Sequence, residues 1–138
     1  SANPDVISYI PTAACFILGV EGEKALVREM QAKTGIKCTS GGMAVSDALR
    51  FVNAKKILMY VPTNKEITDQ SIRYFEDQGF EVRACKYLGL EAMEHINRMS
   101  PWEICSEVMK LHKQNPEAEG IFITGGCFRT LEMIETTA

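Results

Sequence analysis

Apolar and polar residues follow each other along the chain in blocks that predict strands and helices in turn. Short apolar runs predict strands over residues 5–10, 56–61, 80–87 and 120–124. Apolar residues at helical spacing predict helices over residues 23–33 and 43–52, from 63 to the glycine at 79, from 100 onward, and over 129–135. Because strands that alternate with helices are typical of βαβ crossovers, we expect an α/β fold. In this fold a parallel sheet of about four strands lies between flanking helices, in three layers.

Local signals support several of these elements. The uninterrupted apolar run over residues 56–61 is typical of a central strand buried on both faces. Thr63 and Glu66 match a capping box, in which a hydroxyl and a carboxylate satisfy the first N–H groups of a helix. Ser100 and Glu103 form a second such pair, with Pro101 at the first helical position.

Length and composition indicate one ordinary domain over residues 1–138. The 138 residues are 46% apolar and 24% charged, with a net charge of −3. This charge argues against nucleic acid as a partner, because phosphate binding needs an excess of Lys and Arg. The longest apolar runs are too short to cross a bilayer, and the first residues have no signal-peptide pattern. We therefore expect a cytoplasmic protein with neither nucleic acid nor membrane as its partner.

The cysteines suggest neither a disulfide framework nor a metal site. There are five, none in a C-x-x-C pair, and only two histidines. We expect no bound metal. For each cysteine, the alternative to a chemical role is a small buried side chain.

Small and hydroxyl-bearing residues follow three of the predicted strands, where the ligand crevice of an open α/β sheet lies, and a fourth such segment at Thr39 and Ser40 directly precedes a predicted helix. Helices that start at this edge offer free backbone N–H groups and a partial positive charge, which suit a carboxylate or a phosphate. The alternative for each Thr or Ser is an ordinary helix cap. The candidate anion-binding residues are Thr12, Thr39, Ser40, Thr63, Gly125 and Gly126.

Cys127 is the most suggestive thiol. It follows two glycines at a strand-to-helix turn, where a helix N-terminus would lower the thiol pKa and favour the thiolate. Cys15 follows the first predicted strand and could face Cys127 across a carboxylate, so that the two thiols exchange a proton with the α-carbon. The alternative for Cys15 is packing beside Phe16 and Ile17. The sequence contains no Walker loop or G-x-G-x-x-G fingerprint.

The same segments resemble the aspartate/glutamate racemase superfamily, in its maleate cis-trans isomerase and arylmalonate decarboxylase branch. The resembling stretches are residues 5–19, 34–40, 56–63, 79–82 and 121–134. The resemblance implies two facing α/β lobes with a small dicarboxylate between them. Residues 1–37 would belong to the first lobe, and residues 38–138 to the second. It also implies chemistry without a cofactor, in which thiols add to the substrate or move a proton.

The chain departs from this family at both usual cysteine positions, which fall on Pro11 and Gly125. Family chains are also longer at both ends, and a homodimer could complete the truncated lobe. Either Cys127 and Cys15 have taken over the chemistry, or the catalytic pair is gone. The first case predicts an isomerase, racemase or decarboxylase of small carboxylic acids, and the Gly-Gly-Cys turn favours it. The second predicts a non-catalytic anion-binding or assembly module. A phosphate-binding flavodoxin-like or receiver-type domain is a third reading, but it lacks an acidic cluster for a metal.

Overall fold

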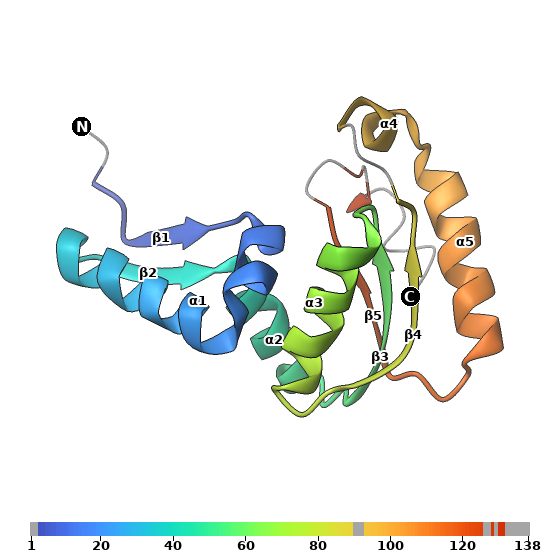
Figure 1. Ribbon diagram of the computed structural model, residues 1–138, viewed down its shortest axis with the longest axis horizontal. Coiled ribbons are helices and arrows are strands. Elements are labelled where there is room, and N and C mark those ends of the chain that lie inside the picture. The colour runs from blue at the N-terminus through green and yellow to red at the C-terminus, as the bar shows by residue number, and fades with distance from the viewer. Residues whose placement is uncertain (1–2, 90–92, 126–127, 129, 132–138) are drawn as a thin grey trace.

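The computed structural model describes residues 3–89, 93–125, 128, 130 and 131. Within this part, helices and strands alternate along most of the chain (Figure 1). In chain order the elements are β1 (Val6–Tyr9), α1 (Thr12–Thr34), β2 (Lys37–Ser40), α2 (Gly41–Phe51), β3 (Lys56–Val61), α3 (Lys65–Glu76), β4 (Glu81–Tyr87), α4 (Met93–Arg98), α5 (Pro101–Gln114) and β5 (Gly120–Ile123).

The described strands form two parallel sheets. Strand β1 pairs with β2, and β3 lies between β4 and β5 in a second sheet. The predicted α/β fold with parallel strands and flanking helices is confirmed. The strands divide between two sheets, however, where one sheet of about four strands was expected. Both edges of β3 are already paired, so β2 has no place beside it, and α2 carries the chain from one sheet to the other (Figure 1).

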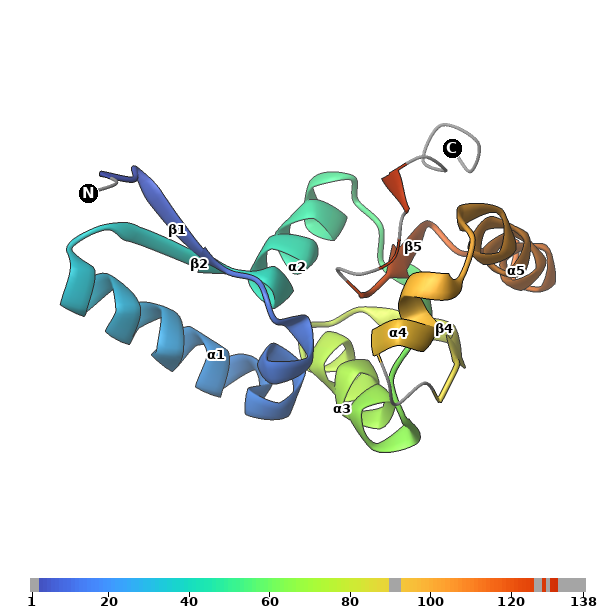
Figure 2. The same cartoon turned by 90° about the horizontal axis from the view of Figure 1, so that it is seen from above.

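The core lies on both faces of β3. Every residue from Ile57 to Val61 is buried, which confirms the predicted central strand. Because side chains alternate along a strand, Ile57 and Met59 pack with Phe75 of α3 on one face, while Tyr60 packs with Ile104 of α5 on the other. The second sheet therefore lies between α3 and α5 in three layers (Figure 2).

Helix α1 begins at Thr12, eleven residues earlier than the predicted helix over 23–33. Its backbone leaves the helical conformation at Gly19, where φ is 67° and ψ is 175°. This break interrupts the apolar periodicity, so the first turns did not match a helical pattern. Strand β2 and helix α4 were not predicted at all; β2 is only four residues long.

The capping predictions had different outcomes. The Ser100 capping box is confirmed, with both of its hydrogen bonds present. At α3 the prediction was wrong, because the cap is Asn64, whose side-chain oxygen accepts from the N–H of Ile67 at 3.0 Å. The Thr63 hydroxyl instead lies 3.2 Å from that of Thr68. The predicted helix over 129–135 lies almost entirely outside the described residues.

The division into two lobes at residues 37 and 38 stays a prediction. Strand β2 spans this boundary and pairs with β1, so residues 37–40 belong to the first sheet.

Candidate functional site

The carboxyl ends of the two sheets meet through a pair of threonines. Thr12 follows β1 and Thr124 follows β5, 112 residues later, yet their hydroxyl oxygens lie 3.1 Å apart. The backbone N–H of Thr124 donates to the carbonyl oxygen of Tyr60 in β3, so Thr124 is held against the second sheet. Loops from both sheets therefore converge on one edge, where open α/β sheets bind ligands.

Two helices begin at this edge without a side-chain cap. The residue before α1 is Pro11, and the residue before α2 is Ser40; neither makes a side-chain capping hydrogen bond. The Ser40 hydroxyl is fully buried and has no hydrogen-bond partner among the described residues. The first N–H groups of a helix have no partner within it and carry a partial positive charge. Two such starts side by side suit an anion.

The starts of α1 and α2 are in close contact. A Cβ atom on Gly41 would lie 2.9 Å from the Ile10 carbonyl oxygen and 2.9 Å from Cγ2 of Thr12. Such distances are below van der Waals contact, so only glycine allows this approach. Glycine at position 41 thus brings the N-terminus of α2 against the β1–α1 turn.

The other predicted anion-binding residues lie at different points of the edge. Thr39 lies in β2 before Ser40, and the strand alternation directs its side chain to the opposite face of the sheet from Ser40. Thr63 follows β3, and its hydroxyl is engaged with Thr68. Gly125 follows β5 with φ of 120°, and a Cβ atom there would lie 3.1 Å from Pro62 and 3.2 Å from Phe128. Only glycine is suited to this turn.

Gly126 and Cys127 lie outside the described residues, so their predicted roles stay predictions. Cys15 is described, and it lies one helical turn inside α1 with no exposed surface. Burial raises the pKa of the Cys15 thiol to about 11, and the neighbouring Glu23 carboxylate acts in the same direction. The thiol therefore keeps its proton at neutral pH. This environment is the one expected for a buried structural cysteine, not for a nucleophile.

Two residues near the edge were not singled out from the sequence. Glu23 of α1 is fully buried, and its carboxylate accepts a hydrogen bond from the hydroxyl of Tyr74 in α3. Desolvation raises the pKa of Tyr74 well above its ordinary value, and Glu23 adds to this effect. The sequence carried one weak signal, because Glu23 is four residues before the buried Val27 and so shares its helix face.

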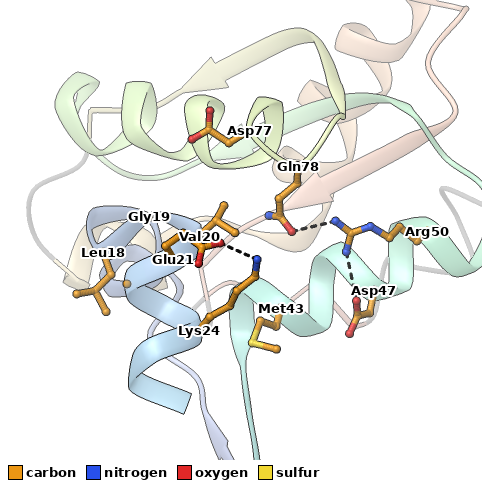
Figure 3. Close-up of a pocket in the computed structure, with 11 residues that line it drawn as sticks. Leu18, Gly19, Val20, Glu21, Lys24, Met43, Asp47, Arg50, Asp77 and Gln78 are labelled. Carbon is orange, nitrogen blue, oxygen red and sulfur yellow. Dashed lines mark hydrogen bonds and ion pairs between the residues drawn. The ribbon is translucent and has the colours of Figure 1, made fainter. Parts of the chain in front are cut away.

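A large hollow lies between α1, α2 and the end of α3, away from this edge (Figure 3). It has a volume of about 840 Å³ and is lined at one end by Arg50 and Gln78, which come from the C-terminal ends of α2 and α3. Arg50 pairs with Asp47 and donates to Gln78, and Lys24 pairs with Glu21. Because both cations in the hollow are already engaged, we place the candidate site at the threonine edge.

Two further observations concern the described residues only. They include no group of three or more metal-ligating side chains placed to hold an ion. No helix among them is both long enough and apolar enough to pass through a membrane.

Known proteins resemble this chain in sequence and fold along nearly its whole length. The sequence profile of arylmalonate decarboxylase matches residues 2–137. The chain belongs to the arylmalonate decarboxylase family. Among its relatives are the arylmalonate decarboxylase of Bordetella bronchiseptica, 22% identical over 129 residues, and the maleate isomerase of Geobacillus stearothermophilus, 28% identical over 122. These alignments cover 94% and 85% of this chain, and 54% and 49% of the relatives. The chain thus spans about half the length of the relatives it matches.

Solved structures of the arylmalonate decarboxylase family and its neighbours have the same fold. A crystal structure of arylmalonate decarboxylase matches with a TM-score of 0.90 and 21% identity, over 98% of this chain and 59% of that one. The maleate isomerase Iso of Pseudomonas putida S16 matches with a TM-score of 0.87 and 16% identity, over 96% and 55%. A maleate cis-trans isomerase mutant of Nocardia farcinica, with a covalently bound succinylcysteine intermediate, matches at 0.84 and 18%, over 96% and 56%. The resemblance to this branch is therefore confirmed.

Proposed function

We propose that this chain carries the carboxylate-binding edge of a cofactor-independent enzyme that isomerises, racemises or decarboxylates small carboxylic or dicarboxylic acids. The contact between Thr12 and Thr124 is the observation that carries the proposal. It brings the uncapped start of α1, with the uncapped start of α2 against it, next to the end of β5.

In this proposal the helix starts hold a substrate carboxylate. The first N–H groups of α1 and α2 donate to its oxygens, and the buried Ser40 hydroxyl, which has no other partner, is a further donor. When the bond at the α-carbon breaks, its electron pair moves into the retained carboxylate, which becomes an enediolate. Fixed donors around those oxygens stabilise the added charge, as in an oxyanion hole.

Cys127 is the proposed proton carrier or nucleophile. In a decarboxylation, the C–C bond breaks to release CO₂, the α-carbon takes a proton from the Cys127 thiol, and the resulting thiolate is reprotonated by water. In an isomerisation, a thiolate adds to the carbon–carbon double bond, rotation follows, and the thiolate leaves. The succinylcysteine intermediate of the Nocardia farcinica isomerase supports thiol chemistry in this group of proteins. Cys15 is the predicted partner of Cys127, but its buried thiol stays protonated at neutral pH, so in this proposal it does not act as a nucleophile.

The second candidate function is a non-catalytic module that binds small anions or assembles with other chains. It is favoured by Pro11 and Gly125 at the two usual cysteine positions and by the burial of Cys15. This alternative predicts that carboxylates bind at the edge without any thiol reacting.

The test is the pH dependence of alkylation at Cys127, followed by mass spectrometry with and without malonate or maleate. Cys85 is the internal control, because burial raises the pKa of this half-buried thiol to about 11. We expect Cys127 to react well below the ordinary cysteine pKa of about 8.5, and the dicarboxylates to protect Cys127 but not Cys85. If Cys127 reacts no faster than Cys85 and is indifferent to the acids, the cysteine mechanism is wrong. Protection without an acidic thiol would favour the binding module.

We further propose a cytoplasmic protein that forms a homodimer. Sedimentation of the full chain measures the second point directly, since a monomer at every concentration would refute the dimer.

A further inference from the structure

A buried carboxylate connects the three helices behind the candidate site. Glu23 of α1 has no exposed surface, and none of the described lysines, arginines or histidines forms an ion pair with it. One of its oxygens accepts from the Tyr74 hydroxyl of α3. The other, Oε1, has no N–H or O–H donor within hydrogen-bond distance among the described residues and would lie 2.6 Å from a Cβ atom on Gly42 of α2. Residues of α1, α2 and α3 thus meet at one buried group.

The break in α1 makes this meeting possible. Cys15 and Glu23 are eight residues apart, which corresponds to about 12 Å along an unbroken helix at about 1.5 Å per residue. The two side chains nevertheless interact, because Glu23 raises the pKa of the Cys15 thiol. The left-handed backbone at Gly19, with φ of 67°, separates the two segments of α1 and changes their direction. Gly19 also lies on the wall of the neighbouring hollow (Figure 3).

The cluster of Glu23, Tyr74, Cys15 and Gly42 lies directly behind the two helix starts. Cys15 is one turn along α1 from Thr12, and Gly42 is the second residue of α2. The packing leaves no room for a larger group at this point, since a Cβ atom on Gly42 would also lie 2.6 Å from the Tyr74 hydroxyl. The Glu23 side chain, held by the Tyr74 hydroxyl, therefore lies directly against the first turn of α2.

We infer that Glu23 is a positioning residue, whose contacts with Tyr74 and Gly42 hold the starts of α1 and α2 together so that both donate to one carboxylate. This inference rests on the proposed function. Glu23 is fully buried and does not touch the ligand; it acts through the two helix starts.

The test compares Glu23→Gln with Glu29→Gln in the full chain. Glu29 is the matched control, because it is an exposed glutamate of the same helix, paired with Lys33. Two measurements are made on each variant. Calorimetry gives the affinity for malonate, and NMR gives the nuclear Overhauser effect between the α-protons of Gly41 and the methyl group of Thr12, which are in contact in the wild type.

We expect Glu23→Gln to weaken the Overhauser effect and to reduce malonate affinity by about fivefold or more, the lower end of ordinary coupling between sites. Glu29→Gln should change neither quantity. If Glu23→Gln lowers only the unfolding temperature and matches the control in both measurements, the positioning role is refuted. Glu23→Gln removes the carboxylate but keeps an acceptor oxygen, whereas Tyr74→Phe removes the donor, and it decides the question if Glu23→Gln does not fold.

If the proposed function is wrong, the outcome of these measurements differs from the outcome expected when only the positioning role is wrong. If the wild type does not bind malonate, that function is wrong for this acid, and the Overhauser effect alone then decides the inference. A contact between Gly41 and Thr12 that persists in both glutamine variants would overturn it, whereas its selective loss in Glu23→Gln would support it.

Discussion

Replacing Tyr74 by phenylalanine removes one buried hydroxyl and keeps the aromatic ring. The Tyr74 ring is 2% exposed and lies between the rings of Phe16 and Phe75, with centroid distances of 5.2 and 5.3 Å. Phenylalanine keeps these contacts. It removes the donor to Glu23, whose other oxygen already has no partner, so a fully buried carboxylate would be left without the tyrosine hydrogen bond.

The expected cost follows from this loss. A hydrogen bond to a charged group contributes about 1.5–3 kcal/mol, and a buried acceptor left unpaired moves the cost toward the upper end. We expect the free energy of unfolding to fall by about 2–3 kcal/mol. With an unfolding entropy of about 2.1 cal/mol/K per residue, this corresponds to a fall of about 7–10 °C in Tm.

Urea unfolding and calorimetry of the wild type, Tyr74→Phe and Tyr87→Phe measure this cost. Tyr87 is the control, because the residue is 48% exposed and its hydroxyl makes no hydrogen bond with any other described residue. We expect Tyr87→Phe to change the free energy of unfolding by less than about 0.5 kcal/mol. The double variant with Glu23→Leu should cost less than the sum of the two single changes, because each single change removes the same hydrogen bond. If Tyr74→Phe is as stable as the wild type, the buried pair does not stabilise the fold and the reasoning is wrong.

Three other predictions concern pH and the backbone. Because burial raises the pKa of Cys15 from 9.0 to about 11, the folded protein should lose stability as pH rises through this range, and Cys15→Ala should flatten that slope in urea titrations. Hydrogen bonds from Lys110 and Lys86 lower the pKa of Glu107 from 4.5 to about 2. The contribution of the Glu107 carboxylate to the free energy of unfolding is therefore present above pH 4.5 and is lost as pH falls toward 2. If Glu107→Gln has the same dependence of unfolding free energy on acid pH as the wild type, this prediction is wrong. Gly35→Ala places a side chain at φ of 68° in open space and should cost about 1–2 kcal/mol. Gly125→Ala should cost more, because its Cβ would also meet two side chains, and equal unfolding midpoints for the two variants would refute this crowding.

Elements with a strong local pattern were predicted well from the sequence. The central strand was found because its apolar run is visible without knowledge of the fold. Helix α5 was found because Ser100, Pro101 and Glu103 form its start within four consecutive residues. Strand β2 and the first turns of α1 were missed. The strand is only four residues long, and the helix is broken at Gly19.

The candidate site was only partly accessible from the sequence. The sequence predicted a common edge, because Thr12 and Gly125 follow predicted strands, Ser40 precedes a predicted helix, and the carboxyl ends of parallel strands share one side of a sheet. It could not show that Thr12 meets Thr124, since 112 residues separate them and no local pattern records their distance. It also gave no reason to choose between a reactive and a buried Cys15.

By itself, then, the sequence determined the α/β class, the central strand and the start of α5, because each of these depends on neighbouring residues and on the hydrophobic period. Only the tertiary structure decided that the strands form two sheets, that Cys15 is closed to solvent, and that Glu23 is buried against Tyr74. A glutamate in a helix is ordinarily exposed. Its burial here results from three helices that meet only after the chain has folded.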